Sequence, residues 1–310
     1  MSGDGGAGVH PHVSVVMCTR NREDKIGTAV RTVLASEYPS FDLTIIDQST
    51  TDATELAISE AADGDARVTY VHSTEPGLSR AYNNGIRRAN GEILAFTDDD
   101  CVVPGDWIAN IVAAFAAEPD GDLLYGSVVA AGDTTDDRSL TPALVVAEPR
   151  RLSKQDGFEI FGMGANFAAR SRLFDRVGLF DELLGGGGPL WSSQDHDLTY
   201  RAYHAGCTIL LRPEVVIRHD GRREVQDWPS LLYAYGSGDG AFYTKHVRCR
   251  DPYASWLLVK NFGEAIIRLV YDAVVKRYLG RWQYLKGLLR GTRASYRYEV
   301  DRSTRLYIEP

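Results

Sequence analysis

The sequence has few cysteines, and none of the spacings in which cysteines act together. Cys18, Cys101, Cys207 and Cys249 lie far apart in 310 residues, with no C-x-x-C pair and no cysteine-histidine spacing of the zinc type. This pattern excludes a disulfide-stapled fold and favours a reducing compartment. The N-terminal MSGDGGAGVHPH also lacks the basic-then-apolar order of a secretory signal. We therefore expect residues 1–12 to be a disordered lead and the protein to be cytoplasmic.

An apolar run suited to crossing a membrane is also missing. The nearest candidate, Trp256 to Val275, carries Lys260, Glu264, Arg268 and Asp272 at four-residue intervals. This spacing places alternating charges along one helix face, which predicts an amphipathic helix and excludes a spanning one. The helix is expected to bury six apolar side chains. These are Leu257, Leu258, Phe262, Ile266, Leu269 and Val270.

Glycine-rich phosphate loops are absent as well. The sequence contains no G-x-x-x-x-G-K-[ST], and no G-x-G-x-x-G follows its first apolar run. The first absence excludes a P-loop nucleotide site, and the second excludes the dinucleotide fingerprint.

The composition that is present is that of an ordinary globular protein, with 44% hydrophobic and 25% charged residues. The length suits one large α/β domain with a smaller appendage. The net charge of −8 hides an asymmetry, because residues 245–310 carry 14 Lys and Arg against 6 Asp and Glu. The preceding 244 residues carry 20 against 36. An acidic body is thus joined to a basic tail, which excludes a protein that is basic throughout.

Short apolar runs alternate with segments of helical periodicity through the first 117 residues. This order predicts four strand-helix units and a largely parallel central sheet covered by helices. The expected strands are Val13 to Met17, Leu43 to Ile46, Val68 to Val71 and Ile93 to Phe96, and the expected helices are Ile26 to Leu34, Thr54 to Ala62, Leu78 to Ala89 and Trp107 to Ala117.

Polar residues follow the first, second and fourth of these strands, at the edge where such sheets bind ligands. They are Cys18 to Arg22, Asp47 to Ser49 and Thr97 to Asp100. Each group alone is compatible with a helix cap or a turn. Three adjacent carboxylates at Asp98 to Asp100 repel one another unless a cation compensates them, which favours a Mg²⁺ or Mn²⁺ site over a solvated acidic turn. Such a metal beside Arg20, Arg22 and Arg80 suits a diphosphate.

The order of the motifs resembles the family 2 glycosyltransferases. The matching segments are VSVVMCTRN, then IID ending at Asp47, then GLSRAYNNG over residues 77–85, then FTDDD ending at Asp100. The resemblance covers residues 13–220 and implies a Rossmann-like nucleotide-sugar-binding fold of the GT-A type. It implies a catalytic domain at 13–240, with a nucleotide-binding half at 13–104 and an acceptor half at 105–240. Residues 241–310 remain as a basic, amphipathic helical extension.

The resemblance also implies roles in donor binding. Thr19, Arg20 and Asn21 would line the base and ribose, and Asp47 would receive a base N–H. Arg80 would lie near the diphosphate, with Asn83 on the same segment contributing to the donor site. The acidic run matches the D-x-D motif of the family. Asp98 would then face the ribose or the metal, Asp100 would bind the metal directly, and Asp99 could take either role.

The segment Gln194-Asp195-His196-Asp197-Leu198 resembles the E-D-x-[DE]-L segment of the family, with Gln194 in place of the usual Glu. The resemblance implies that Asp195 is the catalytic base of an inverting displacement. The alternative is a helix cap at Asp195 and Asp197. His219, after another apolar run, matches the histidine of the family that reaches the metal or the diphosphate. Without the family match, a structural role would be favoured for it.

Gly187, Gly188 and Trp191 precede this segment, and the glycines permit a backbone swing there. They are interpreted either as a lid over donor and acceptor or as a surface turn with one packed aromatic. The Q-x-x-R-W motif of processive members is absent, because Gln226-Asp-Trp228 lacks the Arg and Arg281-Trp282 lacks the Gln. We therefore expect transfer of one sugar, by default from a uridine donor, to a glycan, glycolipid or small-molecule acceptor.

Two other functions are compatible with the fold. One is a catalytically silent nucleotide-sugar-binding protein, which Asp195 and the acidic run argue against. The other is a sugar nucleotidyltransferase, which needs a glycine-rich loop that Cys18-Thr-Arg-Asn-Arg does not supply.

The basic C-terminal segment interleaves aromatic and cationic residues, a pattern that suits the surface of an anionic membrane. The aromatics are Tyr278, Trp282, Tyr284, Tyr296 and Tyr298, and the cations are Arg277, Arg281, Lys286, Arg290, Arg293 and Arg297. Peripheral contact with the inner face of the membrane is one interpretation. Packing on the body or on a homodimer partner is the other. Nucleic acid is not expected as a partner, because no nucleic-acid-binding motif is present and the body is acidic.

Overall fold

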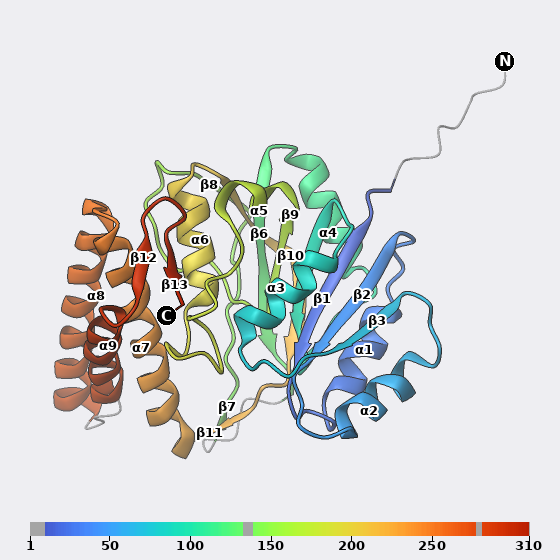
Figure 1. The fold of residues 1–310 in the computed structure, drawn as a ribbon, viewed down its shortest axis with the longest axis horizontal. Helices are drawn as coiled ribbons and strands as arrows, with labels where there is room; N and C mark the ends of the chain where they lie inside the picture. The colour runs from blue at the N-terminus through green and yellow to red at the C-terminus, as the bar shows by residue number, and fades with distance from the viewer. Residues whose placement is uncertain (1–9, 133–138, 277–280, 310) are drawn as a thin grey trace.

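The computed structural model describes residues 10–132, 139–276 and 281–309, with a mixed, mostly parallel β-sheet at its centre (Figure 1). The strand order is β3-β2-β1-β4-β9-β6-β10-β5, and β8 pairs with β10. Pairing is parallel along β3-β2-β1-β4 and between β6 and β10, whereas β9 runs antiparallel between β4 and β6. The predicted α/β, Rossmann-like architecture is confirmed. Of the predicted disordered lead over residues 1–12, residues 1–9 lie outside the described residues. Pro11 accepts a hydrogen bond from the Tyr38 hydroxyl and His12 contacts Asp42, so the end of this segment is packed on the body.

All four predicted strand-helix units are present. They are β1 (Val13–Thr19) with α1 (Ile26–Leu34), β2 (Phe41–Asp47) with α2 (Ala53–Ala62), β3 (Val68–His72) with α3 (Leu78–Arg88), and β4 (Ile93–Asp98) with α4 (Trp107–Ala117). The short β5 (Cys101–Val102) lies between β4 and α4.

The second half of the sheet comes from strands that the sequence analysis did not delimit, apart from the last. They are β6 (Gly121–Ala130), β8 (Arg150–Leu152), β9 (Asn166–Arg170) and β10 (Thr208–His219). Two helices, α5 (Arg172–Val177) and α6 (Gln194–His204), connect β9 to β10. A small separate sheet pairs β7 (Ser139–Leu140) with β11 (Arg223–Glu224).

The two faces of the sheet carry separate apolar cores, because successive side chains of a strand point to opposite faces. Val15 and Met17 belong to one core, which also contains Val30 of α1 and Trp107 of α4. Val16 belongs to the other core, with Tyr82 of α3 and Phe242 of α7 (Trp228–Arg248). Continuous burial from Val13 to Met17 therefore reflects a sheet covered on both sides, as predicted.

The C-terminal region is helical and then returns as a hairpin. It contains η1 (Val225–Asp227), α7 (Trp228–Arg248), α8 (Pro252–Tyr271), the π-helical η2 (Asp272–Lys276), α9 (Arg281–Ser295), β12 (Glu299–Asp301) and β13 (Leu306–Ile308). The helix α7 is continuous across the 240/241 boundary predicted between body and extension. Asp251 caps α8 by accepting hydrogen bonds from the backbone N–H groups of Tyr253 and Ala254, at 3.0 and 3.2 Å.

Helices α7 and α9 pack backbone against backbone. Each carries glycines four residues apart, Gly236 and Gly240 on α7 and Gly287 and Gly291 on α9. A Cβ atom at any of them would overlap a backbone carbonyl oxygen of the opposite helix. Only glycine permits this approach, so the pair is built as a unit.

The predicted helix over Trp256 to Val275 is present as α8 and η2, but its predicted buried face is partly wrong. Leu257 is buried, whereas Ile266 and Val270 are 49% and 56% exposed. The side chains turn outward because no other described element covers that face of α8. Among the described residues, no helix is long and apolar enough to cross a membrane.

Candidate active site

The carboxyl ends of β1, β2 and β4 meet at one edge of the sheet, as the strand order requires. In register, Thr19 lies beside Asp47 and Cys18 beside Asp98. The Thr19 hydroxyl donates a buried hydrogen bond of 2.7 Å to Asp99. The first strand end and the acidic run therefore form one polar edge, as predicted.

The three aspartates after β4 have different electrostatic environments. Burial, together with the carboxylates of Asp100 and Asp99, raises the pKa of Asp98 to about 7. Burial raises the pKa of Asp99 to about 6, against the opposing hydrogen bond from Thr19. Burial also acts on Asp100, but His219 and Arg22 outweigh it and hold the pKa of that carboxyl below its usual value. Burial and mutual repulsion thus make this edge a place where a cation would be stabilising.

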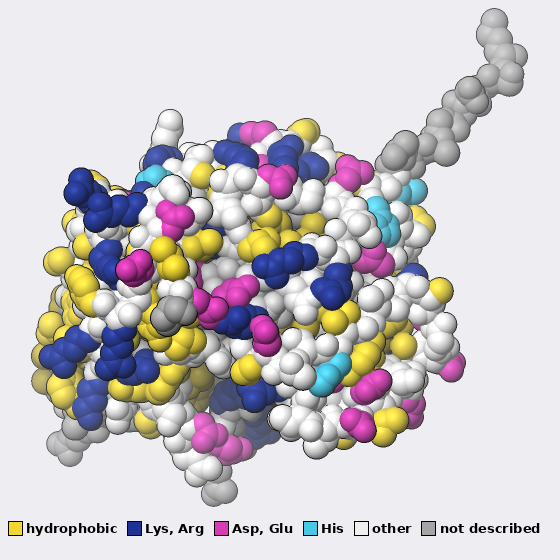
Figure 2. Space-filling view, viewed as in Figure 1, with side chains coloured by type: hydrophobic (Ala, Val, Ile, Leu, Met, Phe, Trp, Pro, Cys, Tyr) yellow, Lys and Arg dark blue, Asp and Glu magenta, His cyan; other side chains and the backbone are white. Residues whose placement is uncertain are grey.

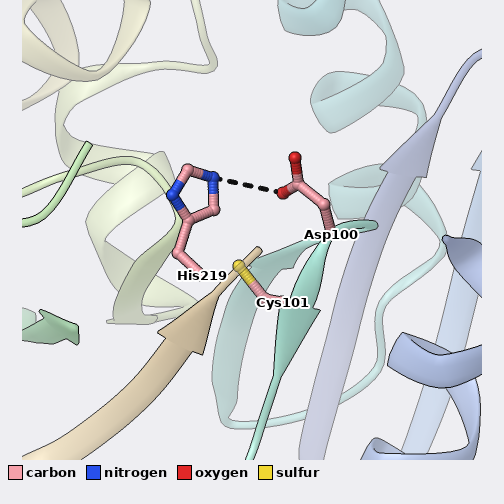
Figure 3. Close-up of side chains that lie close together, drawn as sticks. All are labelled: Asp100, Cys101 and His219. Carbon is pink, nitrogen blue, oxygen red and sulfur yellow. Dashed lines mark ion pairs between the residues drawn. The ribbon is translucent and has the colours of Figure 1, made fainter. Parts of the chain in front are cut away.

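His219, at the end of β10, lies beside this acidic run, because β10 pairs with β5 and sets His219 opposite Cys101 (Figure 3). Its Nε2 lies 3.2 Å from Asp100 Oδ1, and its Nδ1 lies 3.0 Å from the carbonyl oxygen of Pro142. Gly221 closes over the pair, since a Cβ there would overlap the imidazole ring and approach Asp100. His219 and the acidic run therefore lie together in space, although the sequence separates the two by more than a hundred residues. The contact with metal or diphosphate that the resemblance implies for His219 stays a prediction.

The donor set at this edge fits a hard divalent cation. Within one cluster, Asp100 supplies a carboxylate oxygen and His219 a ring nitrogen. Mn²⁺ accepts both kinds of ligand, and Mg²⁺ prefers the oxygen. Cys101 lies within the same cluster. Burial and the charges of Asp98 and Asp100 raise the pKa of its thiol far above the usual range. Hard cations such as Mg²⁺ and Mn²⁺ also prefer oxygen ligands to a thiolate. We regard Cys101 as a neighbour of the site rather than a ligand.

The other residues of the first half that are predicted to bind the nucleotide sugar lie around this edge, and they differ in exposure and in hydrogen bonding. Arg20 and Asn21 are exposed, and Asn21 adopts a positive φ of 52° that turns the chain away from β1. Asn21 bonds across to the β2 end, accepting from the backbone N–H of Thr50 at 3.0 Å. Asp47 is buried, and its carboxylate accepts from the Ser49 backbone N–H and the Tyr70 hydroxyl at 2.8 and 3.1 Å. Both Asp47 oxygens therefore already have donors, and its role towards a base stays a prediction.

Arg80 and Asn83, on α3, contact a carboxylate-bearing segment between α5 and α6. Arg80 lies 3.2 Å from Glu182 and also pairs with Glu309 near the C-terminus. Asn83 is buried, and its amide bonds the backbone of Phe180 and the Glu182 side chain. Asn83 thereby fixes the loop beside Arg80, and the donor contacts predicted for both residues remain predictions.

A cavity of about 590 Å³ opens from this edge toward the C-terminal helices. Asp98 and His219 line it, together with Gly162 to Ala165, Ser192 to His196 and a group of residues from α7, α8 and α9. This volume lies in the range of about 300–1,000 Å³ typical of ligand sites. The last group consists of Leu232, Tyr235, Asp239, Asn261, Glu264, Ala265, Arg268, Arg281 and Tyr284.

Asp195 lies in the wall of this cavity at the first turn of α6. Its Oδ2 accepts from the backbone N–H of Gly164 at 3.0 Å, and its Oδ1 accepts from the N–H of His196 at 3.0 Å. A Cβ at Gly164 would crowd the carboxylate at 3.2 Å, so glycine there lets the segment before β9 support Asp195. A carboxylate held by a helix N-terminus and still facing a cavity has the placement that a base requires.

Asp197, the second aspartate of the segment, has a structural environment instead. It is fully buried against Lys245 at 2.6 Å, Arg201 at 2.9 Å and His246 at 2.9 Å. Despite the opposing effect of burial, the charges of Lys245 and Arg201 and the hydrogen bond with His246 hold the pKa of Asp197 far below its usual value. Lys245 also contacts Asp181 at 2.6 Å. The network joins α6 to α7, so the helix carrying Asp195 is anchored on the C-terminal region.

Asp239 on α7 is a site residue that the sequence analysis missed. It accepts from Ser193 at 2.8 Å and lies 3.2 Å from Nδ1 of His196, while the Tyr284 hydroxyl of α9 donates to it at 2.6 Å. Burial opposes protonation of His196, but Asp195 and Asp239 outweigh it and raise the pKa of His196 to about 9. The only sequence signal was the pair of glycines at 236 and 240, which surround Asp239 but carry no chemistry.

The glycine-rich segment before α6 lies between the start of α3 and the C-terminal helices. Gly186 accepts a hydrogen bond from the backbone of Leu78, and Gly187 lies against Gly77 and Arg20. Gly188 donates to the Gly185 carbonyl, which closes a tight turn. Trp191 packs edge-on to Tyr233 and under the Arg290 guanidinium, 4.2 Å from the ring centroid, and is not among the residues lining the cavity. The lid role predicted for Trp191, Gly187 and Gly188 stays a prediction.

The sheet order, the acidic strand end and the helices around them are those of the GT-A class of glycosyltransferases. Solved structures share this fold. A mannosyltransferase, PcManGT from Pyrobaculum calidifontis in complex with GDP-Man and Mn²⁺, superposes with a TM-score of 0.63 at 20% identity, over 93% of this chain and 87% of its own. S. aureus TarS 1–349 in complex with UDP gives 0.57 at 17% identity, over 92% and 91%.

The family is defined by the sequence itself. The model of glycosyl transferase family 2 matches residues 14–178, which is more than half of the chain. The chain belongs to glycosyl transferase family 2, as its motif order predicted.

Curated relatives are more distant and partial. A glucosyl-dolichyl phosphate glucuronosyltransferase of Haloferax volcanii is 29% identical over 119 residues, 38% of each chain. The glycosyltransferase AglE of the same organism is 26% identical over 221 residues, 68% of each chain. An Escherichia coli UDP-Glc:alpha-D-GlcNAc-diphosphoundecaprenol beta-1,3-glucosyltransferase, WfgD, is 29% identical over 98 residues, 32% of this chain and 37% of its own. The matches to the first and the last of these span less than two fifths of those proteins' own length.

Proposed function

We propose that this protein is a metal-dependent, inverting glycosyltransferase that moves one sugar from a nucleotide-diphosphate sugar to an acceptor hydroxyl, with Asp195 as general base. The observation that carries the proposal is the shared cavity. Asp98, His219 and Asp195 all line it, so a donor held at the sheet edge would present its sugar to the Asp195 carboxylate.

Asp195 would remove the proton of the acceptor hydroxyl as the oxygen attacks the anomeric carbon. The attack comes from the face opposite the leaving nucleoside diphosphate, so the configuration at that carbon inverts. Gly164 and the first turn of α6 hold the carboxylate in one orientation, which reduces the reorganisation that the proton transfer needs.

Asp98, Asp100 and His219 are the residues that would hold Mg²⁺ or Mn²⁺. The bound ion would neutralise charge that develops on the departing diphosphate. Arg22, 3.5 Å from Asp100, and the exposed Arg20 place further cationic groups at the same edge. The neighbouring structures carry GDP-Man with Mn²⁺ or UDP, which supports a nucleotide-sugar donor, and uridine is our proposed base.

The acceptor is proposed to be a glycan or a lipid-linked saccharide that enters between the C-terminal helices. Two relatives are named for dolichyl phosphate and diphosphoundecaprenol substrates, which supports this class. Transfer of a single sugar follows from the missing Q-x-x-R-W motif.

The test is a screen of nucleotide sugars with and without Mn²⁺, first by thermal shift and then by product release. Stabilisation by a donor only when Mn²⁺ is present would identify the nucleotide, since ligands that bind only the native state stabilise it. The wild-type enzyme is expected to release nucleoside diphosphate. Release of pyrophosphate would instead indicate a nucleotidyltransferase, and donor binding without any turnover would indicate a silent binding protein.

The variant Asp195→Asn is expected to fold and to bind donor like the wild type while losing transfer by roughly 10²–10⁴-fold. Asp175→Asn is the matched control, because Asp175 is an exposed aspartate in the first turn of α5. Comparable turnover by Asp195→Asn and Asp175→Asn would refute the assignment of the base.

A further inference from the structure

The outer face of α8 and η2 is an uncovered apolar surface, which we call the α8 stripe. Its residues recur at three- and four-residue intervals, so they lie on one side of the helix. Val259, Ile267 and Val274 are 71%, 69% and 75% exposed, values found in few other large apolar side chains of the described residues. The stripe comprises Trp256, Val259, Ile266, Ile267, Val270, Tyr271, Val274 and Val275. A contiguous surface of this kind marks an interaction site.

Cationic side chains flank the stripe. On α8, Lys260 and Arg268 are exposed on either side of Glu264, which pairs with both. On α9, Lys286 and Arg293 are exposed and alternate with Trp282 and Leu289 along one helix face. Figure 2 shows hydrophobic side chains with Lys and Arg beside them at the left edge of the molecule, where Figure 1 places α8 and α9. The described part of these two faces therefore combines an apolar centre with a net positive margin.

The aromatic residues have the arrangement of an interfacial surface. Lys260 Nζ lies 5.3 Å from the ring centroid of Trp256, and Lys286 Nζ lies 5.5 Å from that of Trp282. Both indoles are partly exposed, with a cation at their side. Tryptophan beside lysine is suited to a lipid headgroup region, where the ring and the stem of the lysine are buried and the ammonium reaches phosphate.

A second copy of the chain fits this surface less well. A twofold interface places the same patch on both subunits, so pairing two α8 stripes would set the Lys and Arg margins of α8 and α9 against each other. An anionic bilayer supplies apolar chains for the stripe and phosphates for the margins. Charge complementarity thus favours the bilayer.

We propose that the α8 stripe and the cationic margins of α8 and α9 dock the protein on the surface of an anionic membrane, with α8 lying in the plane of the interface. The structure adds a spatial reason for this placement. Asn261, Glu264, Ala265 and Arg268 of the same helix line the cavity. The helix that meets the bilayer therefore also forms a wall of the site that contains Asp195.

This surface differs from the one expected from the sequence. One of the two interpretations of the sequence placed membrane contact at the aromatic and basic residues from Arg277 onward, of which Arg277 and Tyr278 lie outside the described residues. Of the others, Tyr284 faces the cavity and Arg290 covers Trp191. The exposed apolar face that the structure adds belongs to α8, where Ile266 and Val270 were expected to be buried.

The experiment is flotation of the full chain with vesicles of phosphatidylcholine alone or mixed with phosphatidylglycerol. Wild type is expected to float with the mixed vesicles, and less so as salt is raised. Val259→Glu with Ile267→Glu is expected to reduce that binding by roughly tenfold or more. Each substitution removes an apolar side chain and introduces a negative charge, which the anionic lipid repels. Lys286→Glu with Arg293→Glu is expected to reduce it by roughly fivefold or more per residue at low salt.

Leu56→Glu is the matched control, since Leu56 is 68% exposed on α2 at a distance from the stripe in sequence and in the fold. It should float like wild type, and all variants should keep the wild-type melting temperature within a few degrees. The assay contains neither donor nor acceptor, so its result is independent of the proposed chemistry. Failure of wild type to float with mixed vesicles would overturn the proposal. A second outcome would also overturn it. In that outcome, light scattering shows that wild type is a dimer, the double variant Val259→Glu, Ile267→Glu is a monomer, and neither protein binds vesicles.

Discussion

Nδ1 of His196 and Oδ1 of Asp239 lie 3.2 Å apart, which joins the residue next to the candidate base to the first of the C-terminal helices. Asp239 also accepts hydrogen bonds from the hydroxyl of Ser193, in the turn before α6, and from the hydroxyl of Tyr284 on α9. The wall that contains Asp195 is therefore supported by α7 and α9. The C-terminal region is thus part of the construction of the cavity as well as a surface.

The first prediction concerns Asp239 as a positioning residue. Asp239→Asn keeps an oxygen acceptor but removes the charge, so it should fold, lower the pKa of His196 from about 9 and reduce kcat. NMR titration of the His196 ring measures the pKa shift, and Mn²⁺-dependent donor binding should stay unchanged. Asp175→Asn is the control for loss of one negative charge. An unaltered His196 titration together with unaltered kcat would show that Asp239 serves the packing only.

The second prediction is a pH dependence of stability that depends on His196. Its folded-state pKa is raised, from 6.5 to about 9, so its stabilising contribution is complete below about pH 6.5 and is lost as pH rises through about 9. The contribution is on the order of 3 kcal/mol. His196→Gln should therefore melt below wild type at pH 6, and the gap should narrow by pH 9.5.

The measurement is the melting temperature of both proteins across that range, with His72→Gln as a control at an exposed histidine outside the cavity. A gap of constant size from pH 6 to 9.5 would mean that His196 contributes by packing and not by its charge.

The third prediction compares the contributions of His219 and Cys101 to metal binding. His219→Ala should weaken Mn²⁺-dependent donor binding by roughly tenfold or more, since it removes a nitrogen next to Asp100. Cys101→Ala should leave that binding near wild type, because its thiol is held protonated by burial and by Asp98 and Asp100. Calorimetry with Mn²⁺ and the donor measures both. If Cys101→Ala lost metal affinity and His219→Ala kept it, the assignment of ligands would be reversed.

The first half of the fold could be predicted because its signals are local. Strands such as Val13 to Met17 are covered on both faces and have mostly apolar sequences, interrupted here only by Ser14, and each is followed by a helix of clear periodicity. Polar residues after these strands then had to meet at one sheet edge, which placed Thr19 beside the acidic run. His219 was placed by its motif alone, since nothing in its spacing indicates a contact with Asp100.

The second half depended on tertiary contacts that leave no local pattern. Asp239 and Tyr284 enter the cavity only because α7 and α9 approach closely at their glycines. Lys245 is fully buried between Asp181 and Asp197, a position that its charge would argue against in any sequence analysis. Conversely, Ile266 and Val270 were expected inside and lie outside, because periodicity identifies an apolar face but not what covers it.

The fourth prediction tests the glycine contact between α7 and α9. A Cβ at Gly291 would overlap the carbonyl oxygen of Ser237, so Gly291→Ala must separate the two helices. The expected loss is about 1–3 kcal/mol of unfolding free energy, and more if the helices cannot shift. Because Tyr284 reaches Asp239 across this contact, kcat should fall as well.

Gly263→Ala on α8 is the matched control for that substitution, since a Cβ there meets no atom within 4 Å. Replacing glycine by alanine inside a helix adds up to about 1 kcal/mol of stability where space allows. The two variants should therefore shift the denaturant midpoint in opposite directions, Gly291→Ala downward and Gly263→Ala upward, with unchanged slopes. Equal upward shifts in both would mean that α7 and α9 are not in backbone contact, and the support of Asp195 through Asp239 and Tyr284 would lose its physical basis.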